Sequence, residues 1–255
     1  MQQQISTSAI DKVIVADKLT KKFGNFTAVD HISFEVKRGE IFGFLGANGA
    51  GKTTAMRMLC GLSIPTGGTG LVAGFDISKD SEQVKKHIGY MSQKFSLYDD
   101  LKVWENIELF GGIYGMKEHE IKAKTDKLMH LLHFEKERDK LVGELPLGFK
   151  QKLAFSVSIF HTPQVVFLDE PTGGVDPITR RQFWELIYDA TARGITVFVT
   201  THYMDEAEYC NRVSIMVDGK IEALDTPKKL KEQFGASSMD EVFHQLARKA
   251  KRIDS

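Results

Sequence analysis

The sequence predicts an α/β protein whose parallel sheet is covered by helices and interrupted by an inserted helical segment. Three observations predict this fold class. Apolar strands alternate with helices after residue 163, which is typical of a parallel sheet. The continuously apolar segment 41–45 has the composition of a strand buried on both faces. Between about residues 95 and 161 the pattern is helical instead, so this segment is predicted to be inserted into the α/β core.

The N-terminal third is predicted to consist of strands and turns. In residues 31–36, Ile32, Phe34 and Val36 alternate with polar residues, which is the period of a half-buried strand. Glycines follow the apolar strand 41–45, and a helix is expected from Lys52 until Gly61 closes it. Residues 66–74 return to glycine-punctuated β structure.

Helical and strand segments can be assigned in order along the rest of the chain. In the inserted segment, helices are expected at 105–115, 119–134 and 149–160. Ile121, Leu128, Leu131 and Leu132 are expected on one helical face. Beyond Pro163 the expected order is strand 164–168, helix 177–193, strand 195–200, helix 203–209 and strand 212–217.

The C-terminal tail carries helix start and stop signals. Thr226 followed by Pro227 predicts an N-cap with proline in the first turn, and Gly235 predicts the end of that helix. Residues 238–241 fit a capping box, which would open a last helix rich in Lys and Arg at its end.

Composition excludes several classes of protein. The chain has 255 residues, 42% of them hydrophobic and 27% charged, so a buried core is expected. Lys plus Arg and Asp plus Glu both number 34, and this balance argues against a nucleic-acid binder. The sequence lacks a secretory leader and an apolar run of about 18 residues, so we expect a cytosolic chain. Cys60 and Cys210 are accordingly expected to be buried free thiols.

The most specific motif follows the strand 41–45 and precedes a helix. It matches the phosphate-binding loop pattern, with expected nucleotide-binding residues Gly46, Ala47, Asn48, Gly49, Ala50, Gly51, Lys52, Thr53 and Thr54. Its glycines let backbone N–H groups face phosphates, and the helix N-terminus adds a positive dipole. Lys52 would contact the phosphates, and the Thr53 hydroxyl would bind Mg²⁺. The sequence therefore predicts a site for ATP and Mg²⁺.

Two carboxylates follow the apolar strand 164–168. Ligands of open parallel sheets bind beyond the carboxyl ends of the strands, where a phosphate loop would also lie. Asp169 is therefore predicted to hold Mg²⁺, and Glu170 to polarise the attacking water as a general base. The strand 195–200 leads to His202 at the same edge.

Taken together, the motifs closely resemble those of the nucleotide-binding subunit of ABC transporters. Their order is the phosphate loop, Gln93 within GYMSQ, the helical segment, LDEPTGGVDP at 168–177 and TTH at 200–202. The resemblance extends from about Val13 to Gly235. It implies a RecA-like core with an N-terminal antiparallel β subdomain and an inserted α-helical subdomain. The ATP-binding domain would span 10–235, with the helical subdomain at about 95–161, and a C-terminal helix would occupy 236–255.

The resemblance also implies roles for single residues. Phe23 resembles the aromatic residue that stacks on adenine, although the family more often has Tyr there. Gln93 resembles the residue that senses Mg²⁺, the water and the membrane partner. Asp176 resembles the acid of the D-loop, and His202 resembles the switch residue at the γ-phosphate.

One segment departs from the family pattern. Where the family has LSGGQ, this chain has Leu145, Pro146, Leu147, Gly148 and Phe149. In the family this segment faces the nucleotide bound to the opposite subunit. Pro146 lacks both the serine hydroxyl and a backbone donor, and Leu147 adds bulk where glycine is usual. We therefore expect the chain to complete its partner's ATP site weakly.

The resemblance implies the motor subunit of an ABC transporter at the cytoplasmic face of the inner membrane. Its partners would be a separate transmembrane permease and a second ATP-binding subunit, identical or different, without nucleic acid. The segment 239–243, MDEVF, is similar to the ending of ABC-2-type exporters. An importer subunit and a soluble ABC ATPase acting on ribosomes or DNA are the alternatives. Partly exposed apolar residues for docking the permease are expected at Phe95, Leu97, Tyr98 and Trp104. The alternative is that these four side chains fill the core of the helical lobe.

Overall fold

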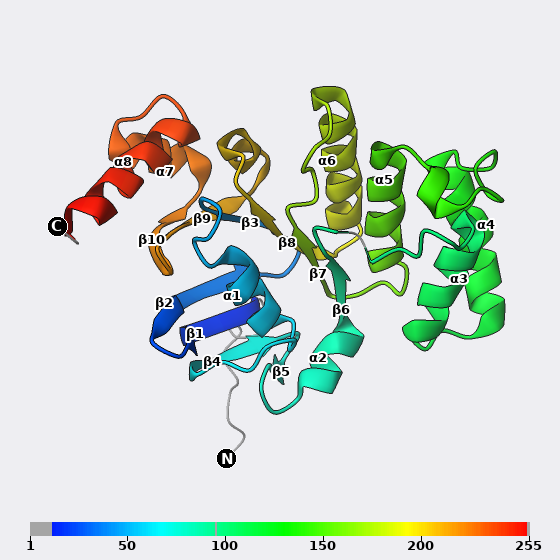
Figure 1. Cartoon of the computed structure of the whole chain (residues 1–255), viewed down its shortest axis with the longest axis horizontal. Helices are drawn as coiled ribbons and strands as arrows, with labels where there is room; N and C mark the ends of the chain where they lie inside the picture. Colours follow the sequence, from blue (N-terminus) through cyan, green and yellow to red (C-terminus); the bar gives the residue numbers. More distant parts are fainter. Residues whose placement is uncertain (1–11, 95, 254–255) are drawn as a thin grey trace, which may run out of the picture.

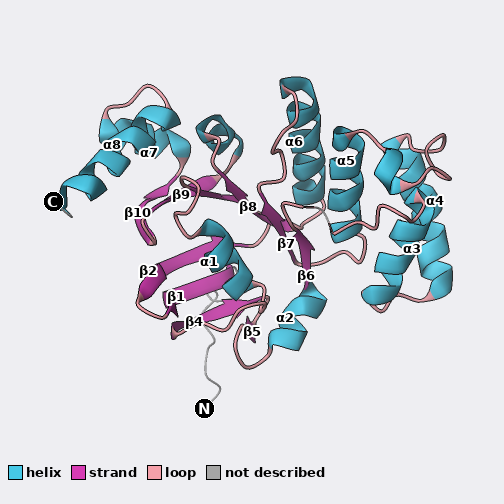
Figure 2. Cartoon of the chain, viewed as in Figure 1, coloured by secondary structure: helices cyan, strands magenta, loops and turns pink. Residues whose placement is uncertain are grey.

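The computed structural model describes residues 12–94 and 96–253, and it contains two sheets (Figures 1 and 2). The smaller sheet has the strand order β2-β1-β4-β5 and is antiparallel. Its strands are β1 (Lys12–Phe23), β2 (Phe26–Lys37), β4 (Gly67–Val72) and β5 (Phe75–Asp76). It forms the predicted N-terminal β subdomain.

The larger sheet has the strand order β10-β9-β3-β8-β7-β6. Its strands are β3 (Ile41–Leu45), β6 (Ile88–Met91), β7 (Val165–Asp169), β8 (Thr196–Thr201), β9 (Arg212–Val217) and β10 (Lys220–Asp225). All neighbours are parallel except β10, which pairs with β9 as an antiparallel hairpin. Because Leu45 pairs with Thr201 and Asp169 with Thr200, the strands β3, β7 and β8 end at one edge.

Helices cover the larger sheet and form the inserted lobe (Figure 2). The helices are α1 (Lys52–Leu59), α2 (Ser81–His87), α3 (Val103–Ile113), α4 (Glu118–Leu132), α5 (Leu147–Ser158), α6 (Pro177–Ala192), α7 (Pro227–Phe234) and α8 (Met239–Ile253), with 3-10 turns η2 (Val142–Glu144) and η3 (Met204–Tyr209). None of the described helices is both long and apolar enough to cross a membrane.

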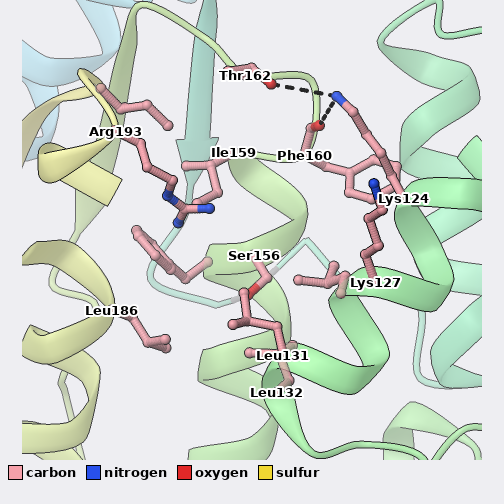
Figure 3. A pocket seen from close by; sticks show the side chains of 13 residues that line it. Lys124, Lys127, Leu131, Leu132, Ser156, Ile159, Phe160, Thr162, Leu186 and Arg193 are labelled. Carbon is pink, nitrogen blue, oxygen red and sulfur yellow. Dashed lines mark hydrogen bonds between the residues drawn. The ribbon is translucent and has the colours of Figure 1, made fainter. Parts of the chain in front are cut away.

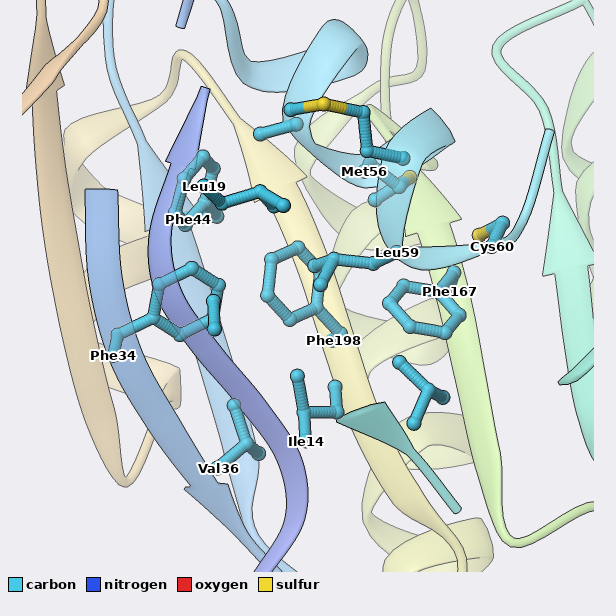
Figure 4. Close-up of a cluster of buried hydrophobic side chains, with 14 of the residues drawn as sticks. Ile14, Leu19, Phe34, Val36, Phe44, Met56, Leu59, Cys60, Phe167 and Phe198 are labelled. Carbon is cyan, nitrogen blue, oxygen red and sulfur yellow. The ribbon is translucent and has the colours of Figure 1, made fainter. Parts of the chain in front are cut away.

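The main core lies between the two sheets and α1 (Figure 4). The Phe198 ring on β8 lies at its centre, 5.3 Å from the Phe44 and Phe167 rings and 6.1 Å from Phe34 of the smaller sheet. All these rings are buried, so the two sheets are held together by apolar contact. This packing places the β1–β2 turn beside the phosphate loop.

A second core joins the other face of the large sheet to α5 and α6, and a third lies within the lobe of α3, α4 and α5. Between α5 and β6 the backbones approach closely. A Cβ atom at Gly89 would lie 2.0 Å from the carbonyl oxygen of Ser158, so only glycine permits this contact.

The structure corrects three local expectations. The segment 203–209 contains the 3-10 helix η3 rather than an α-helix. On α4, Leu131 is 58% exposed, because the buried row is Ile121, Thr125 and Met129 at four-residue spacing. In the last capping box, Ser238 Oγ accepts from the Glu241 N–H as expected, but Glu241 Oε2 accepts from the N–H of Ser237 instead of Ser238.

Other local expectations are confirmed. Thr226 Oγ1 accepts from the Lys229 N–H at the start of α7, and Gly235 ends that helix in the left-handed conformation. Cys60 and Cys210 are both buried and unpaired. Burial raises the pKa of both thiols, so they remain protonated and unreactive.

Candidate nucleotide-binding site

The phosphate loop connects β3 to α1 at the carboxyl edge of the large sheet. Gly51 is the N-cap of α1 with φ of 103°, and a Cβ atom there would lie 2.3 Å from the carbonyl oxygen of Ala28. Only glycine can adopt this conformation in this space. The loop residues Ala47, Asn48 and Gly49 are exposed, whereas Ala50 packs into the main core. The exposed part of the loop is therefore free to contact a ligand.

Lys52 is a buried cation inside this loop, with only 4% of its surface exposed. Its Nζ donates to the carbonyl oxygens of Gly46 at 2.8 Å and Ala47 at 3.1 Å. It also lies 3.3 Å from Glu170 Oε1. Because a buried charge is costly unless it is paired, these oxygens hold the ammonium where anionic groups would enter the loop.

Asp169 ends β7 and is buried. Its Oδ1 accepts from the Thr200 hydroxyl at 2.7 Å and from the Thr53 hydroxyl at 3.1 Å. The parallel register that pairs Asp169 with Thr200 produces the first contact. The two predicted Mg²⁺ ligands, Thr53 and Asp169, are therefore adjacent. Sequence reasoning missed the role of Thr200, whose signal was a threonine at the carboxyl end of a mostly apolar strand.

Glu170 lies close to the other two predicted catalytic residues, Gln93 and His202. Gln93 Nε2 donates to Glu170 Oε2 at 3.1 Å. His202 Nδ1 lies 3.1 Å from the same oxygen, although without hydrogen-bond alignment. Glu170 has a φ of 48°, and its N–H donates to the Thr200 carbonyl and hydroxyl oxygens. This strained backbone directs the carboxylate toward the loop rather than along the strand.

The interior next to Asp169 is apolar and disfavours further negative charge. Burial, and then the Asp169 carboxylate, raises the pKa of Tyr90 to about 12. The same two causes raise the pKa of Cys60. Both groups stay neutral, so the carboxylates are the acidic groups available for chemistry at this edge.

A cleft of about 450 Å³ opens above the loop. Its lining residues are Phe23, Phe26, Ala28, Asn48, Gly49, Gly51, Lys52, Thr53, Thr54, Gln93 and Glu170. Of the other predicted residues, Gly46, Ala47, Ala50, Asp169 and His202 lie beside the cleft but outside its lining. A flat apolar wall at one end and a cation at the other suit a nucleotide.

Two aromatic rings form the mouth of this cleft. Phe23 and Phe26 pair across the turn between β1 and β2, and they are 56% and 64% exposed. Lys21 Nζ lies 5.2 Å from the centre of the Phe23 ring. Sequence reasoning found Phe23 but missed Phe26, which the tight turn at Gly24 and Asn25 brings to the same place.

The site residues fit Mg²⁺ together with phosphate oxygens. Within residues 12–94 and 96–253, no group of three or more His, Cys, Asp or Glu side chains could hold a metal ion by itself. Thr53, Asp169 and Gln93 nevertheless offer hydroxyl, carboxylate and amide oxygens. Mg²⁺ is commonly held by one or two carboxylates and by the phosphates of a substrate, and this oxygen set suits that mode.

The altered signature segment lies away from this cleft, at the start of α5. Pro146 is the N-cap and supplies no side-chain cap, Leu147 is 42% exposed, and Leu145 is buried. The Phe149 ring stacks on Phe134 at 5.1 Å. None of the five signature residues lines the cleft that contains Lys52.

The predicted D-loop residue Asp176 lies next to this segment. It is the N-cap of α6, accepting from the N–H groups of Ile178 and Thr179. A hydrogen bond from the Thr179 hydroxyl, followed by the one from its N–H, lowers the pKa of Asp176. A Cβ atom at Gly148 would lie 2.7 Å from Thr179 Cγ2, so the starts of α5 and α6 are neighbours. Leu147 and Asp176, at these two helix starts, are both exposed.

With this geometry established, comparisons with known proteins identify the family. A family model described as ABC transporter matches residues 29–173. The chain belongs to the ABC transporter family. A solved structure described as the ATP-binding subunit of an ABC transporter superposes with a TM-score of 0.83 at 25% identity, covering 92% of this chain and 99% of that one. The fold class and the family predicted above are confirmed.

Two curated relatives refine this assignment. The probable multidrug ABC transporter ATP-binding protein YbhF of Escherichia coli is 48% identical over 241 residues, covering 92% of this chain and 42% of the relative. The Nod factor export ATP-binding protein I of Paraburkholderia xenovorans is 38% identical over 221 residues, covering 86% of this chain and 73% of the relative. The chain thus spans about two fifths of the length of the first relative. It is an ABC transporter ATPase domain.

Proposed function

We propose that the chain is the ATP-hydrolysing motor subunit of an ABC-2-type exporter. It works with a separate transmembrane permease and a second ATP-binding subunit, at the cytoplasmic face of the inner membrane. The names of the multidrug and Nod factor relatives support export over import. The equal numbers of basic and acidic residues argue against the alternative of an ATPase that acts on ribosomes or DNA.

The observation that carries this proposal is the position of Glu170. Its carboxylate lies within 3.3 Å of Lys52, Gln93 and His202. In this proposal Lys52 binds the β- and γ-phosphates, Asp169 and Thr53 hold Mg²⁺, and Phe23 stacks on adenine. Glu170 takes the proton of the attacking water, Gln93 senses that water and Mg²⁺, and His202 contacts the γ-phosphate.

The contacts of Lys52 suggest how binding leads to a reactive carboxylate. Lys52 is held by two carbonyl oxygens and by Glu170, and a phosphate entering the loop competes for the same ammonium. When the phosphate replaces Glu170 as the partner of Lys52, Glu170 keeps its hydrogen bond from Gln93 and can accept a proton. Mg²⁺, when bound, would neutralise part of the negative charge of the phosphates.

The proposed domain division follows the packing of the lobe. The ATP-binding domain comprises 10–235, of which residues 10 and 11 lie outside the described part of the chain. The helical subdomain at about 95–161 has a core of its own. The C-terminal segment 236–255 contains α8, which packs on η3 and β9 through Met239, Val242 and Leu246.

Substitution of the general base tests the proposal directly. Glu170→Gln should retain ATP binding but lower turnover by roughly 10²–10⁴-fold, because the amide cannot accept the proton. Lys52→Ala should weaken ATP binding as well. Glu185→Gln, an exposed glutamate on α6, is the matched control and should hydrolyse ATP normally. A Glu170→Gln protein with the wild-type rate of phosphate release would show that Glu170 is not the base.

A further inference from the structure

A second cavity, of about 240 Å³, lies between α4, α5 and α6 (Figure 3). It shares no lining residue with the nucleotide cleft. Its walls are mostly apolar and include Leu128, Leu131, Leu132 and Leu186. Leu131 is 58% exposed, so this apolar surface reaches the entrance of the cavity.

The polar part of the lining is entirely positive or neutral. Lys124, Lys127 and Arg193 line the cavity, and no acidic residue does. Lys124 Nζ donates to the carbonyl oxygen of Phe160, and Arg193 Nε donates to that of Asp189. In the described part of the chain none of these three cations forms an ion pair with a carboxylate. Three unpaired cations around one cavity are notable in a chain with no net charge.

The cations and the leucines lie toward different ends of the cavity, and Ile159 and Phe160 lie near the cations. Figure 3 shows Lys124, Arg193 and Thr162 toward one end, and Leu131, Leu132 and Leu186 toward the other. A ligand that satisfies both ends must therefore be amphiphilic, with an anionic head and an apolar tail.

The size of the cavity limits the shape of the tail. The cavity has a volume of about 240 Å³, and four leucines line it. A single unbranched alkyl chain is thin enough to enter between the leucines.

We propose that this cavity binds an amphiphile with one unbranched alkyl chain and an anionic head, such as a fatty-acid carboxylate. The head contacts Lys124, Lys127 and Arg193. The chain lies against Leu128, Leu132 and Leu186. This site is separate from the ATP site and adds a ligand to the proposed motor subunit.

Calorimetric titration tests whether the alkyl chain lies in the apolar part of the cavity. The full chain is titrated with octanoate and with decanoate, both below micelle-forming concentrations. Each buried methylene should tighten binding about fourfold, so decanoate should bind about 15-fold more tightly than octanoate. Decanol, with the same chain and a neutral head, should bind about tenfold more weakly than decanoate. Equal dissociation constants for octanoate and decanoate, or no saturable binding of decanoate, would overturn the proposal.

Variants at the entrance of the cavity test whether its cations bind the anionic head. Lys127→Gln combined with Arg193→Gln should weaken decanoate binding about tenfold or more, because charge-assisted hydrogen bonds are lost. Lys86→Gln combined with Lys136→Gln removes the same charge from exposed positions outside the cavity and should change nothing. All four positions are exposed, so folding should be retained. Equal affinities for the two double variants would contradict the assignment.

A cysteine introduced at Leu131 provides a separate test. Protection of this cysteine by a membrane partner, but not by decanoate, would also overturn the proposal and would indicate a protein interface.

Discussion

At the residue scale, Phe23 and Phe26 are two exposed rings at the mouth of the cleft where we propose that the nucleotide base binds. They pair across the β1–β2 turn and both line the cleft. Exposed phenylalanines are unfavourable in water unless a ligand covers them, and a purine offers a flat surface of the right kind. The packing of the two sheets brings this turn to the phosphate loop, which places an aromatic wall and Lys52 in one cleft.

We predict that Phe23→Ala weakens ATP binding about tenfold, because stacking on a base contributes about 1–3 kcal/mol. Phe26→Ala is the matched comparison and should have the smaller effect. Equilibrium titration with a fluorescent ATP analogue measures both constants. A larger loss for Phe26→Ala would assign the adenine contact to the second ring.

His161 is the residue whose protonation should control the pH dependence of folding. Its Nε2 donates to the Ile88 carbonyl oxygen, its ring stacks on Tyr114 at 3.7 Å, and its Nδ1 is buried without a partner. Burial, followed by the charges of Lys124 and His87, lowers the pKa of His161 to about 4, although the Ile88 hydrogen bond opposes the shift. Protonation would place an N–H donor where it has no acceptor.

The unfolded chain therefore binds more protons than the folded chain between about pH 4 and pH 6.5. The stabilising effect of neutral His161 is complete above pH 6.5 and is lost as the pH falls toward 4. We predict that urea unfolding at pH 7 and pH 5 shows roughly 1–2 kcal/mol of this loss in the wild type. His161→Gln should show correspondingly less loss. The same pH dependence in both proteins would mean that His161 is not responsible.

At the element scale, the start of α5 is the part that departs from the family pattern. The Pro146 carbonyl oxygen accepts from the N–H groups of Phe149 and Lys150, so the helix begins normally without a capping side chain. Leu147 is 42% exposed, and a Cβ atom at Gly174 would lie 3.6 Å from its Cδ2. A segment that acts on a partner's nucleotide would have to do so from here, with the helix dipole but without the serine hydroxyl.

We predict that Pro146→Ser combined with Leu147→Gly raises the ATPase activity of the purified chain, if two copies form the dimer. A restored donor set can contribute about 2.7–4 kcal/mol to the transition state. Phosphate release is the measurement, and Leu147→Gly alone controls for a loosened helix start. An unchanged rate, with normal folding and ATP binding, would show that the variant segment is fully active in this chain.

At the scale of the whole molecule, the segment after Gln93 joins the nucleotide site to the helical lobe. Leu97 packs against both the lobe core and the second core. Asn106 exchanges hydrogen bonds with the backbone of Tyr98, while the Tyr98 side chain stays 49% exposed. Trp104 is also partly exposed, and Phe95 lies outside the described residues. The expected partial exposure is thus confirmed for Leu97, Tyr98 and Trp104.

This segment is our proposed docking surface for the permease, because its backbone is held while an aromatic ring faces outward. We predict that Tyr98→Glu reduces co-purification of the chain with membranes containing its permease, without changing ATP affinity. Ile64→Glu, at an apolar residue that is 72% exposed elsewhere, is the control. Unchanged membrane association of the Tyr98 variant would place the docking surface elsewhere.

The parts of the molecule that depend on local pattern could be predicted from the amino-acid sequence. The strands β3 and β9 have the predicted bounds, because their runs of apolar residues are short and sharply bordered. The phosphate loop and the Asp169–Glu170 pair are equally local, since glycine conformation and strand ends are properties of a few adjacent residues. Their common location also follows, because parallel strands present their carboxyl ends at one edge.

Contacts between groups that are distant in the sequence depend on how the elements pack in three dimensions. The partners of Glu170, the Thr200 hydroxyl on Asp169 and the second ring at Phe26 each depend on strand register or sheet packing. The exposure of Leu131 and the cavity beside it depend on how α4, α5 and α6 pack together. These features could not be predicted from periodicity, because burial and contact are set by residues far away in the sequence, whereas periodicity records only the preference of one segment for water or for the core.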